Sequence, residues 1–167
     1  VCRLQVALAE CQARRDYRSQ AETLRKRTME RVSSLESESR AEILHEMAES
    51  CLRVRELVAA REIAEKVLEE RIADGGRKDQ WAGRSLLVLA EADLRSYRLE
   101  GTETAIAMSR PSLEGSPYWT KALLLKCQSE FFLGREEEAY AILDSLPPSE
   151  ALELQLPLAV WRGHAET

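Results

Sequence analysis

The stretch from Ala122 to Pro148, ALLLKCQSEFFLGREEEAYAILDSLPP, decides the fold class of this chain. Apolar residues recur at helical spacing on both sides of Gly134, and glycine suits the tight turn that would join two short helices. Pro147 and Pro148 close the second segment because proline has no backbone N–H with which to continue a helix. The stretch therefore predicts a helical hairpin, and weaker versions of the pattern occur upstream.

Three further pairs of helices are predicted before this hairpin. Apolar residues at helical spacing mark segments at about 2–13 and 21–35, at 43–52 and 57–68, and at 81–94 and 105–108. Boundary signals separate these segments. They are Arg14–Asp16, a capping box of Ser39 with Glu42, a stop at Asp74–Gly76, a cap at Asp79, a turn at Gly101 with Thr102 as cap, a stop at Pro111, and a start at Ser116–Pro117.

Composition supports a folded helical protein and excludes several classes of function. Hydrophobic residues make up 44% and charged residues 32% of the chain, whose formal net charge is -5. No apolar stretch approaches the roughly 20 residues that span a bilayer. The four cysteines are widely spaced and form no zinc motif, so we expect small apolar packing residues in a reducing, intracellular and cytoplasmic setting. The chain opens with Val1 instead of Met, which indicates a fragment of a longer protein.

The hairpin pattern resembles the tetratricopeptide repeat family, in which small residues lie where two helices touch. The best match runs over 120–148, with Cys127 and Ala139 at the small positions and Gly134 in the turn. Lys126 and Glu130 depart from the family pattern, which favours apolar or aromatic residues there. A generic helical solenoid and an irregular helical bundle are the alternatives. The reference alanines of the four hairpins are Ala21, Ala60, Ala105 and Ala139, spaced 39, 45 and 34 residues apart.

The resemblance implies an all-α, right-handed solenoid of about four hairpins forming one domain over residues 1–167. A last helix from about Ser149 to Trp161 would cover its open end. The first helix of each hairpin would then line a concave face that holds a partner. The family pattern places these residues on that face: Glu42, His45, Glu49 and Leu52 in the second hairpin, Ala90, Leu94 and Tyr97 in the third, and Lys121, Leu124, Gln128 and Phe131 in the fourth.

These residues predict a protein-binding scaffold without catalytic activity or cofactor. The chain contains no asparagine, so it cannot form the clamp with which some tetratricopeptide domains hold a peptide carboxylate. Glu42, Glu46 and Glu49 make the second hairpin acidic, which predicts a basic or amphipathic protein segment as ligand. The alternative function is a sensor or regulatory repeat module within a larger signalling or transcription-regulating protein.

Enzymatic, metal-dependent and nucleic-acid-binding functions are disfavoured. His45 and Glu49 belong to an HExxE sequence, but a zinc protease requires histidine where Glu49 stands. Phosphate-binding and nucleophile-elbow motifs are absent from the sequence. Arg14, Arg18 and Arg25 could form a basic stripe, yet the aromatic residues that stack on nucleic-acid bases are nearly missing beside it.

Overall fold

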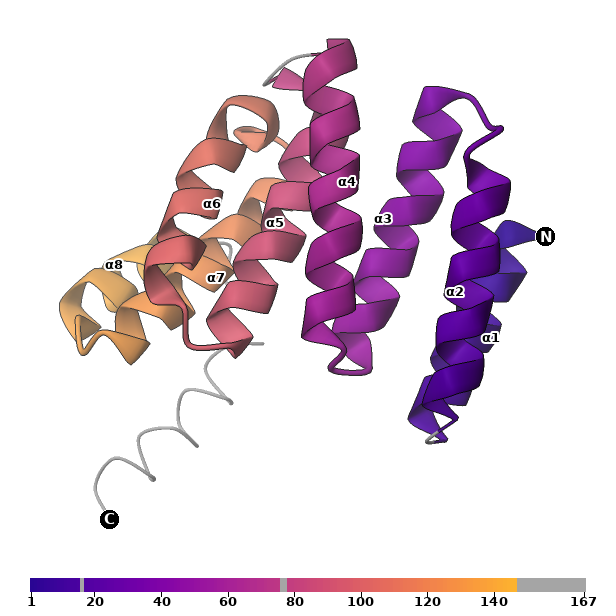
Figure 1. The fold of residues 1–167 in the computed structure, drawn as a ribbon. Helices are drawn as coiled ribbons and strands as arrows, with labels where there is room; N and C mark the ends of the chain where they lie inside the picture. Colours follow the sequence, from indigo (N-terminus) through magenta and orange to yellow (C-terminus); the bar gives the residue numbers. More distant parts are fainter. Residues whose placement is uncertain (16, 76–77, 147–167) are drawn as a thin grey trace.

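The computed structural model of the chain describes residues 1–15, 17–75 and 78–146, and within these ranges it contains eight α-helices and no strand. The predicted all-α class is therefore confirmed. The helices, labelled in Figure 1, are α1 (Cys2–Arg14), α2 (Arg18–Val32), α3 (Ser37–Arg53), α4 (Leu57–Gly75), α5 (Gln80–Arg95), α6 (Leu99–Leu113), α7 (Pro117–Phe132) and α8 (Glu136–Ser145).

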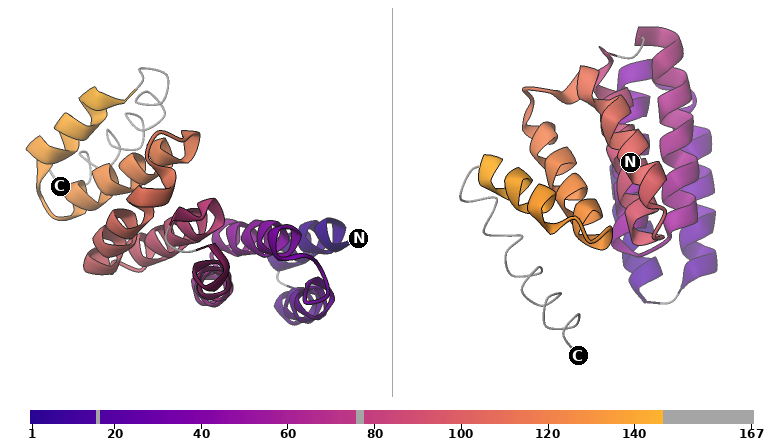
Figure 2. Two further views of the ribbon diagram at one scale, coloured as in Figure 1. Left: turned by 90° about the horizontal axis from the view of Figure 1, so that it is seen from above. Right: turned by 90° about the vertical axis from the view of Figure 1, so that its left-hand side faces the viewer.

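The helices pair in sequence as four hairpins, α1–α2, α3–α4, α5–α6 and α7–α8, and the hairpins stack into an elongated row that bends towards its last members (Figure 2). Helices α1, α3, α5 and α7, the first of each hairpin, also contact one another from one hairpin to the next. A helical-repeat arrangement is thus present, as the sequence predicted. The predicted closing helix from Ser149 to Trp161 lies outside the described residues.

The turns within the hairpins share one geometry. Arg55, Tyr97 and Gly134 have positive φ angles of 61°, 57° and 73°. The residue after each of them donates its backbone N–H to the carbonyl oxygen five residues back, at 2.9, 2.8 and 2.9 Å. This bond closes a helix end with a left-handed residue and satisfies carbonyls that have no partner inside the helix. In the first hairpin the N–H of Tyr17 makes the same bond to Gln12, at 2.9 Å.

The common turn geometry places small residues at fixed distances from the turn. In each hairpin one small residue lies eight positions before the residue whose N–H closes the turn, and another lies four positions after it. Where these two residues face each other, the helices contact directly. The Thr102 hydroxyl lies 3.3 Å from the carbonyl oxygen of Ala90, and the Cys127 thiol lies 3.5 Å from the carbonyl oxygen of Ala139. The small residues, all buried, are Ala9, Ala48, Ala90 and Cys127 in the first helices and Ala21, Ala60, Thr102 and Ala139 in the second.

The third hairpin turns at Tyr97, so the predicted turn at Gly101 and the predicted cap at Thr102 are wrong. Helix α6 begins at Leu99, and both residues lie inside it. The equivalent of Ala60 is therefore Thr102 and not Ala105. Gly101 serves helix packing, because a Cβ atom there would come within 3.1 Å of the Asp93 carboxyl carbon. The small residues of the second helices are then spaced more evenly, at 39, 42 and 37 residues, through Ala21, Ala60, Thr102 and Ala139.

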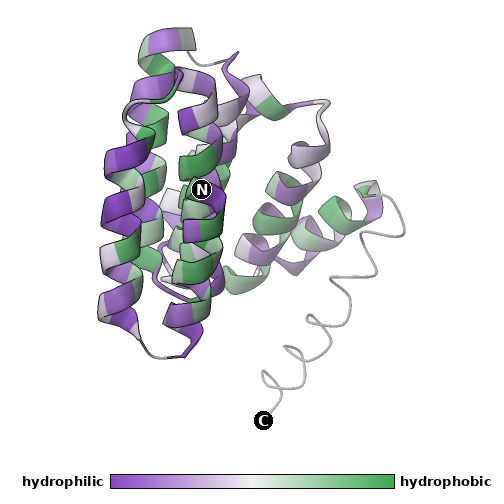
Figure 3. Ribbon diagram, turned by 90° about the vertical axis from the view of Figure 1, so that its right-hand side faces the viewer, coloured by the Kyte–Doolittle hydropathy of each residue, from purple (hydrophilic) through white to green (hydrophobic). Residues whose placement is uncertain are grey.

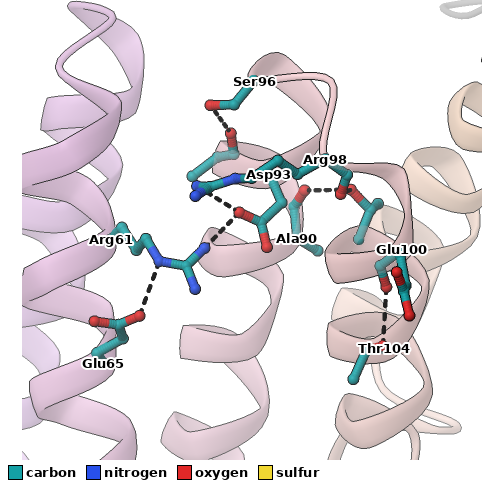
Figure 4. Close-up of polar contacts among 10 residues, drawn as sticks. Arg61, Glu65, Ala90, Asp93, Ser96, Arg98, Glu100 and Thr104 are labelled. Carbon is teal, nitrogen blue, oxygen red and sulfur yellow. Dashed lines mark hydrogen bonds and ion pairs between the residues drawn. The ribbon is translucent and has the colours of Figure 1, made fainter.

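Asp93 joins the second and third hairpins (Figure 4). Its side chain is only 7% exposed and pairs with Arg61 of α4 and with Arg98, which lies 2.7 Å away at the start of α6. Arg61 also pairs with Glu65 on its own helix, at 2.9 Å. A buried carboxylate requires such partners because burial removes its hydration. Gly101 leaves the space that this carboxylate occupies.

Two other predicted boundaries are wrong. Helix α3 begins at Ser37, so Ser39 and Glu42 lie within it and form no capping box. Helix α6 continues past Pro111 to Leu113, which is fully buried. A Cβ atom at Gly83 would lie 2.7 Å from the Leu113 side chain, so α5 accepts this leucine only because it has a glycine there. Burial of Leu113 outweighs the backbone N–H that Pro111 lacks.

Three other boundary signals act as predicted, but the Ser116 side chain makes no capping hydrogen bond at the start of α7, and Asp16 lies outside the described residues. The Asp79 carboxylate accepts a hydrogen bond from the Ala82 N–H, at 2.9 Å, and so caps α5. Helix α4 ends at Gly75, and Pro117 opens α7 after Ser116. Each of these signals acts within one helical turn, so the neighbouring residues in the sequence are sufficient to predict it.

The left-handed turn residues lead to a stability prediction. Gly134→Ala should lower the free energy of unfolding by about 1 kcal/mol, because alanine is strained at positive φ although no atom of the structure obstructs its Cβ. Arg55→Gly, at the equivalent exposed position, should raise it by about 0.5 kcal/mol, since the relief of strain exceeds the entropy that glycine loses. Chemical denaturation measures both changes. If both substitutions changed the free energy of unfolding in the same direction, the shared turn geometry would be contradicted.

Candidate functional site

The side chains in register on the first helices form one surface, which we call the first-helix face. It is counted from the four residues whose N–H closes the turn, Tyr17, Glu56, Arg98 and Arg135. The face consists of the residues fourteen positions before each of them, Arg3, Glu42, Arg84 and Lys121, and of those seven positions before, Glu10, Glu49, Glu91 and Gln128. Figure 2 shows the helices that carry it, α1, α3, α5 and α7, following one another along the row.

Lys121 shows that this face is continuous. Its ammonium group lies 3.0 Å from the Glu91 carboxylate on α5 and 3.4 Å from the Glu49 carboxylate on α3. One side chain of the fourth hairpin therefore contacts both the third and the second hairpin. Such contacts require the three first helices to converge, which agrees with the bend of the row in Figure 2.

The carboxylates of the face are paired within the chain. Glu42 and Glu46 both bind Arg3, at 2.6 and 3.2 Å. Glu10 binds Arg53 of the next hairpin, at 2.8 Å. The acidic residues that predicted a basic ligand therefore already have cations of this chain beside them, and the attraction for an incoming basic segment is correspondingly reduced.

The predicted partner-binding residues fall into three groups. Glu42, Glu49, Lys121 and Gln128 belong to the first-helix face and are partly exposed. His45, Leu52, Ala90 and Leu94 are buried, whereas Leu124 and Phe131 are half-buried against the core of the last hairpin. Tyr97 is a turn residue and is 70% exposed. Its ring contacts that of Phe132, with centroids 5.4 Å apart, and so links the third hairpin to the fourth.

Arg84 and Glu91 are residues of the face that the sequence-based prediction missed. The prediction placed the third turn at Gly101, four residues too late, and so chose the wrong residues of α5. A signal for the correct register exists in the sequence, since the pattern Ala-Glu-x-x-x-Arg recurs at residues 9–14, 48–53 and 90–95. In the first and third copies the glutamate binds the arginine four residues later, as Glu10 with Arg14 and Glu91 with Arg95.

His45 lies beneath the face. It is 3% exposed, and its Nε2 atom is 3.5 Å from the Glu49 carboxylate. The ring also meets that of Trp81 edge to face, with centroids 5.8 Å apart. In the described part of the chain no three His, Cys, Asp or Glu side chains are grouped so that they could hold a metal ion. Packing against Trp81 accounts for the ring and Glu49 for Nε2, whereas Nδ1 is buried without a hydrogen-bond partner among the described residues.

Two carboxyl groups of the face make the stability of the chain depend on pH in the acidic range. A hydrogen bond from Arg53 lowers the pKa of Glu10 to about 2, and a hydrogen bond from His45 lowers that of Glu49 to about 2, against an ordinary 4.5. Both groups have a lower pKa in the folded chain than in the unfolded chain, so between about pH 2 and pH 4.5 the unfolded chain binds more protons. This stabilisation is complete above about pH 4.5 and is lost as the pH falls towards 2.

Replacing both groups tests that linkage. The double variant Glu10→Gln, Glu49→Gln should lose less stability between pH 5 and 2 than the unchanged chain, because it has no proton to take up at either position. Denaturant unfolding at several pH values measures the slope. Equal slopes for the two proteins would show that these ion pairs contribute nothing to stability.

Packing accounts for three of the four cysteines. All four are free thiols; Cys51 and Cys127 are buried and Cys2 packs half-buried against the core, whereas Cys11 is exposed, so the packing role predicted for Cys11 is wrong. Burial raises the pKa of the Cys51 and Cys127 thiols to about 11, so they stay protonated at neutral pH and are poor nucleophiles.

The opposite side of the stack carries an apolar groove of about 430 Å³ between α4 and α6, with α5 as its floor. Ile72 and Met108 on its walls are 39% and 44% exposed. Elsewhere hydrophilic and hydrophobic residues alternate along the helices (Figure 3), and none of the helices in the described ranges is long and apolar enough to cross a membrane.

Comparison with protein-family models, curated proteins and solved structures gave no match for this chain. The site is therefore interpreted from its own geometry.

Proposed function

We propose that the chain is a non-catalytic scaffold that binds a segment of a partner protein along the first-helix face. In this proposal the hairpins form a right-handed solenoid of the tetratricopeptide type, and the face is its concave side. The repeated turns, the paired small residues and the side-by-side first helices support this interpretation, because stacked hairpins of this kind create extended binding surfaces.

The observation that carries the proposal is the contact of Lys121 with both Glu91 and Glu49. Because one side chain joins three hairpins, their first helices form a single surface, along which we expect an extended or helical segment to bind. The paired charges of this surface would fix the orientation of a ligand more than they would raise its affinity.

Selection from a random-peptide display library tests the proposal. Peptides selected on the intact chain should bind Lys121→Met about tenfold more weakly, because the variant separates the three hairpins at the centre of the face. Lys66→Met is the matched control, since Lys66 is exposed on α4, away from the face. Circular dichroism establishes that both variants are folded. Failure to select any peptide, or equal binding by both variants, would contradict the proposal.

A further inference from the structure

Arg84 differs from the other cations of the first-helix face. Its guanidinium group lies over the rings of Trp81 and Tyr118, at 4.2 and 4.4 Å from their centroids. Both aromatic residues lie sixteen positions before the turn residue of their hairpins, so the repeat brings one ring from each of two hairpins to the arginine. Arg3 and Lys121, at the equivalent positions of other hairpins, bind carboxylates of this chain.

Arg84 forms no ion pair and donates no hydrogen bond to any residue that the structure describes. Its Nε atom is buried without an acceptor, although arginine at such a position normally has one. The two rings attract the guanidinium cation, but they replace none of the hydrogen bonds that its N–H groups can donate. A cation held against two rings has less freedom to lose when an anion binds its N–H groups.

We propose that Arg84 is a binding residue of the first-helix face that receives the carboxylate of an acidic side chain in the partner segment. This inference rests on the proposed scaffold function. A carboxylate matches the fork of a guanidinium group and can accept two parallel hydrogen bonds from it. The half-buried rings of Trp81 and Tyr118 would contact apolar side chains next to the acidic residue.

The charges of the surroundings favour a carboxylate over a phosphate. The carboxylates of the face are already paired, Glu42 with Arg3, and Glu49 and Glu91 with Lys121. Arg84 is the cation of the face that has no acidic partner among the described residues, so one carboxylate neutralises it, whereas a doubly charged phosphate would keep an excess negative charge. The ligand chemistry is thus opposite to the basic segment that the glutamates alone predicted.

A double-mutant cycle tests this assignment with peptides selected from the random-peptide display library. Selected peptides should contain an aspartate or glutamate, and its change to the corresponding amide should weaken binding about tenfold or more. Arg84→Gln should weaken binding of the acidic peptide by a similar factor and should leave binding of the amide peptide unchanged. Arg84→Lys should recover only part of the loss, because lysine keeps the charge but not the planar fork.

Arg27→Gln is the control for net charge, since Arg27 is exposed on α2, and it should bind as the unchanged chain does. Near-ultraviolet circular dichroism shows whether Arg84→Gln preserves the packing of the neighbouring aromatic rings. If the selected peptides lack acidic residues, or if the peptide and protein changes act independently, the Arg84 assignment is overturned while the scaffold function stands. If no peptide is selected, the scaffold function and the assignment fail together.

Discussion

Replacing Asp93 by alanine should lower the free energy of unfolding by about 3 kcal/mol. The carboxylate is 7% exposed and joins Arg61 of the second hairpin to Arg98 of the third. The variant loses a charge-assisted hydrogen bond from Arg61, worth roughly 1.5–3 kcal/mol, and the ion pair with Arg98, and it leaves a small cavity beside Gly101. Both arginines remain partly exposed, so water takes over much of their hydrogen bonding. The loss of stability is therefore expected at the lower end of the range for a buried ion pair that loses one partner.

Urea denaturation followed by circular dichroism measures this loss. Asp144→Ala is the matched control: Asp144 is exposed near the end of α8, so its removal should change stability by less than about 0.5 kcal/mol. The double variant Arg61→Gln, Arg98→Gln should destabilise the chain about as much as Asp93→Ala, because it leaves a buried carboxylate without a cation. An Asp93→Ala protein as stable as the unchanged chain would show that Asp93 does not join the two hairpins.

Ala60→Leu should also destabilise the chain by about 3 kcal/mol. Ala60 is the small residue five positions after the turn of the second hairpin, and it has no exposed surface. The added carbons would push α4 away from α3 where the two helices touch, or would force side chains out of their preferred rotamers. Ala73→Leu, at an exposed position of the same helix, is the control and should be nearly neutral.

Thermal and urea unfolding of the two leucine variants provide the comparison. The difference between them isolates the packing term, because both changes have the same effect on helix propensity. Similar stabilities for Ala60→Leu and Ala73→Leu would mean that α3 and α4 do not meet at the small residues, and the common register of the hairpins would then be in doubt.

Local signals made most of the fold predictable. Helical spacing, the proline at 117 and the cap at Asp79 each act within about one turn of a helix, so the sequence nearby suffices to recognise them. The third hairpin could not be placed correctly in this way. Gly101 looks like a turn residue, but its role is to make room for Asp93, and that contact exists only after α5 and α6 have packed.

The identity of the turn residues explains why neighbouring residues did not predict the turn of the third hairpin. Tyr97 and Arg55 adopt positive φ without being glycine, so their identity gives no hint of a turn. What determines the turn is the hydrogen bond to the carbonyl five residues back, together with the small residues that bring the two helices into contact. The recurring Ala-Glu-x-x-x-Arg pattern would have revealed the register, because it precedes the turn by a constant interval.

The candidate site was predictable only in part, for the same reason. The prediction includes Glu42, Glu49 and Lys121 because the helical spacing breaks between 52 and 57, where Arg55 turns the chain, and because Gly134 marks the fourth turn. Arg84 was missed because the third turn was predicted at the wrong position. The ion pairs of the face join different hairpins, such as Lys121 with Glu49, and no sequence spacing predicts a contact between residues so far apart in the chain.

The hairpins share one register, with turns at Arg55, Tyr97 and Gly134. A ¹⁵N-edited nuclear Overhauser spectrum of the chain reports on this register at each turn. We expect strong amide-to-Hα cross-peaks within these three residues, as positive φ requires, helical cross-peaks through Gly101, and contacts between the rings of Tyr97 and Phe132. Helical cross-peaks running through Tyr97, with a turn at Gly101 instead, would contradict this register.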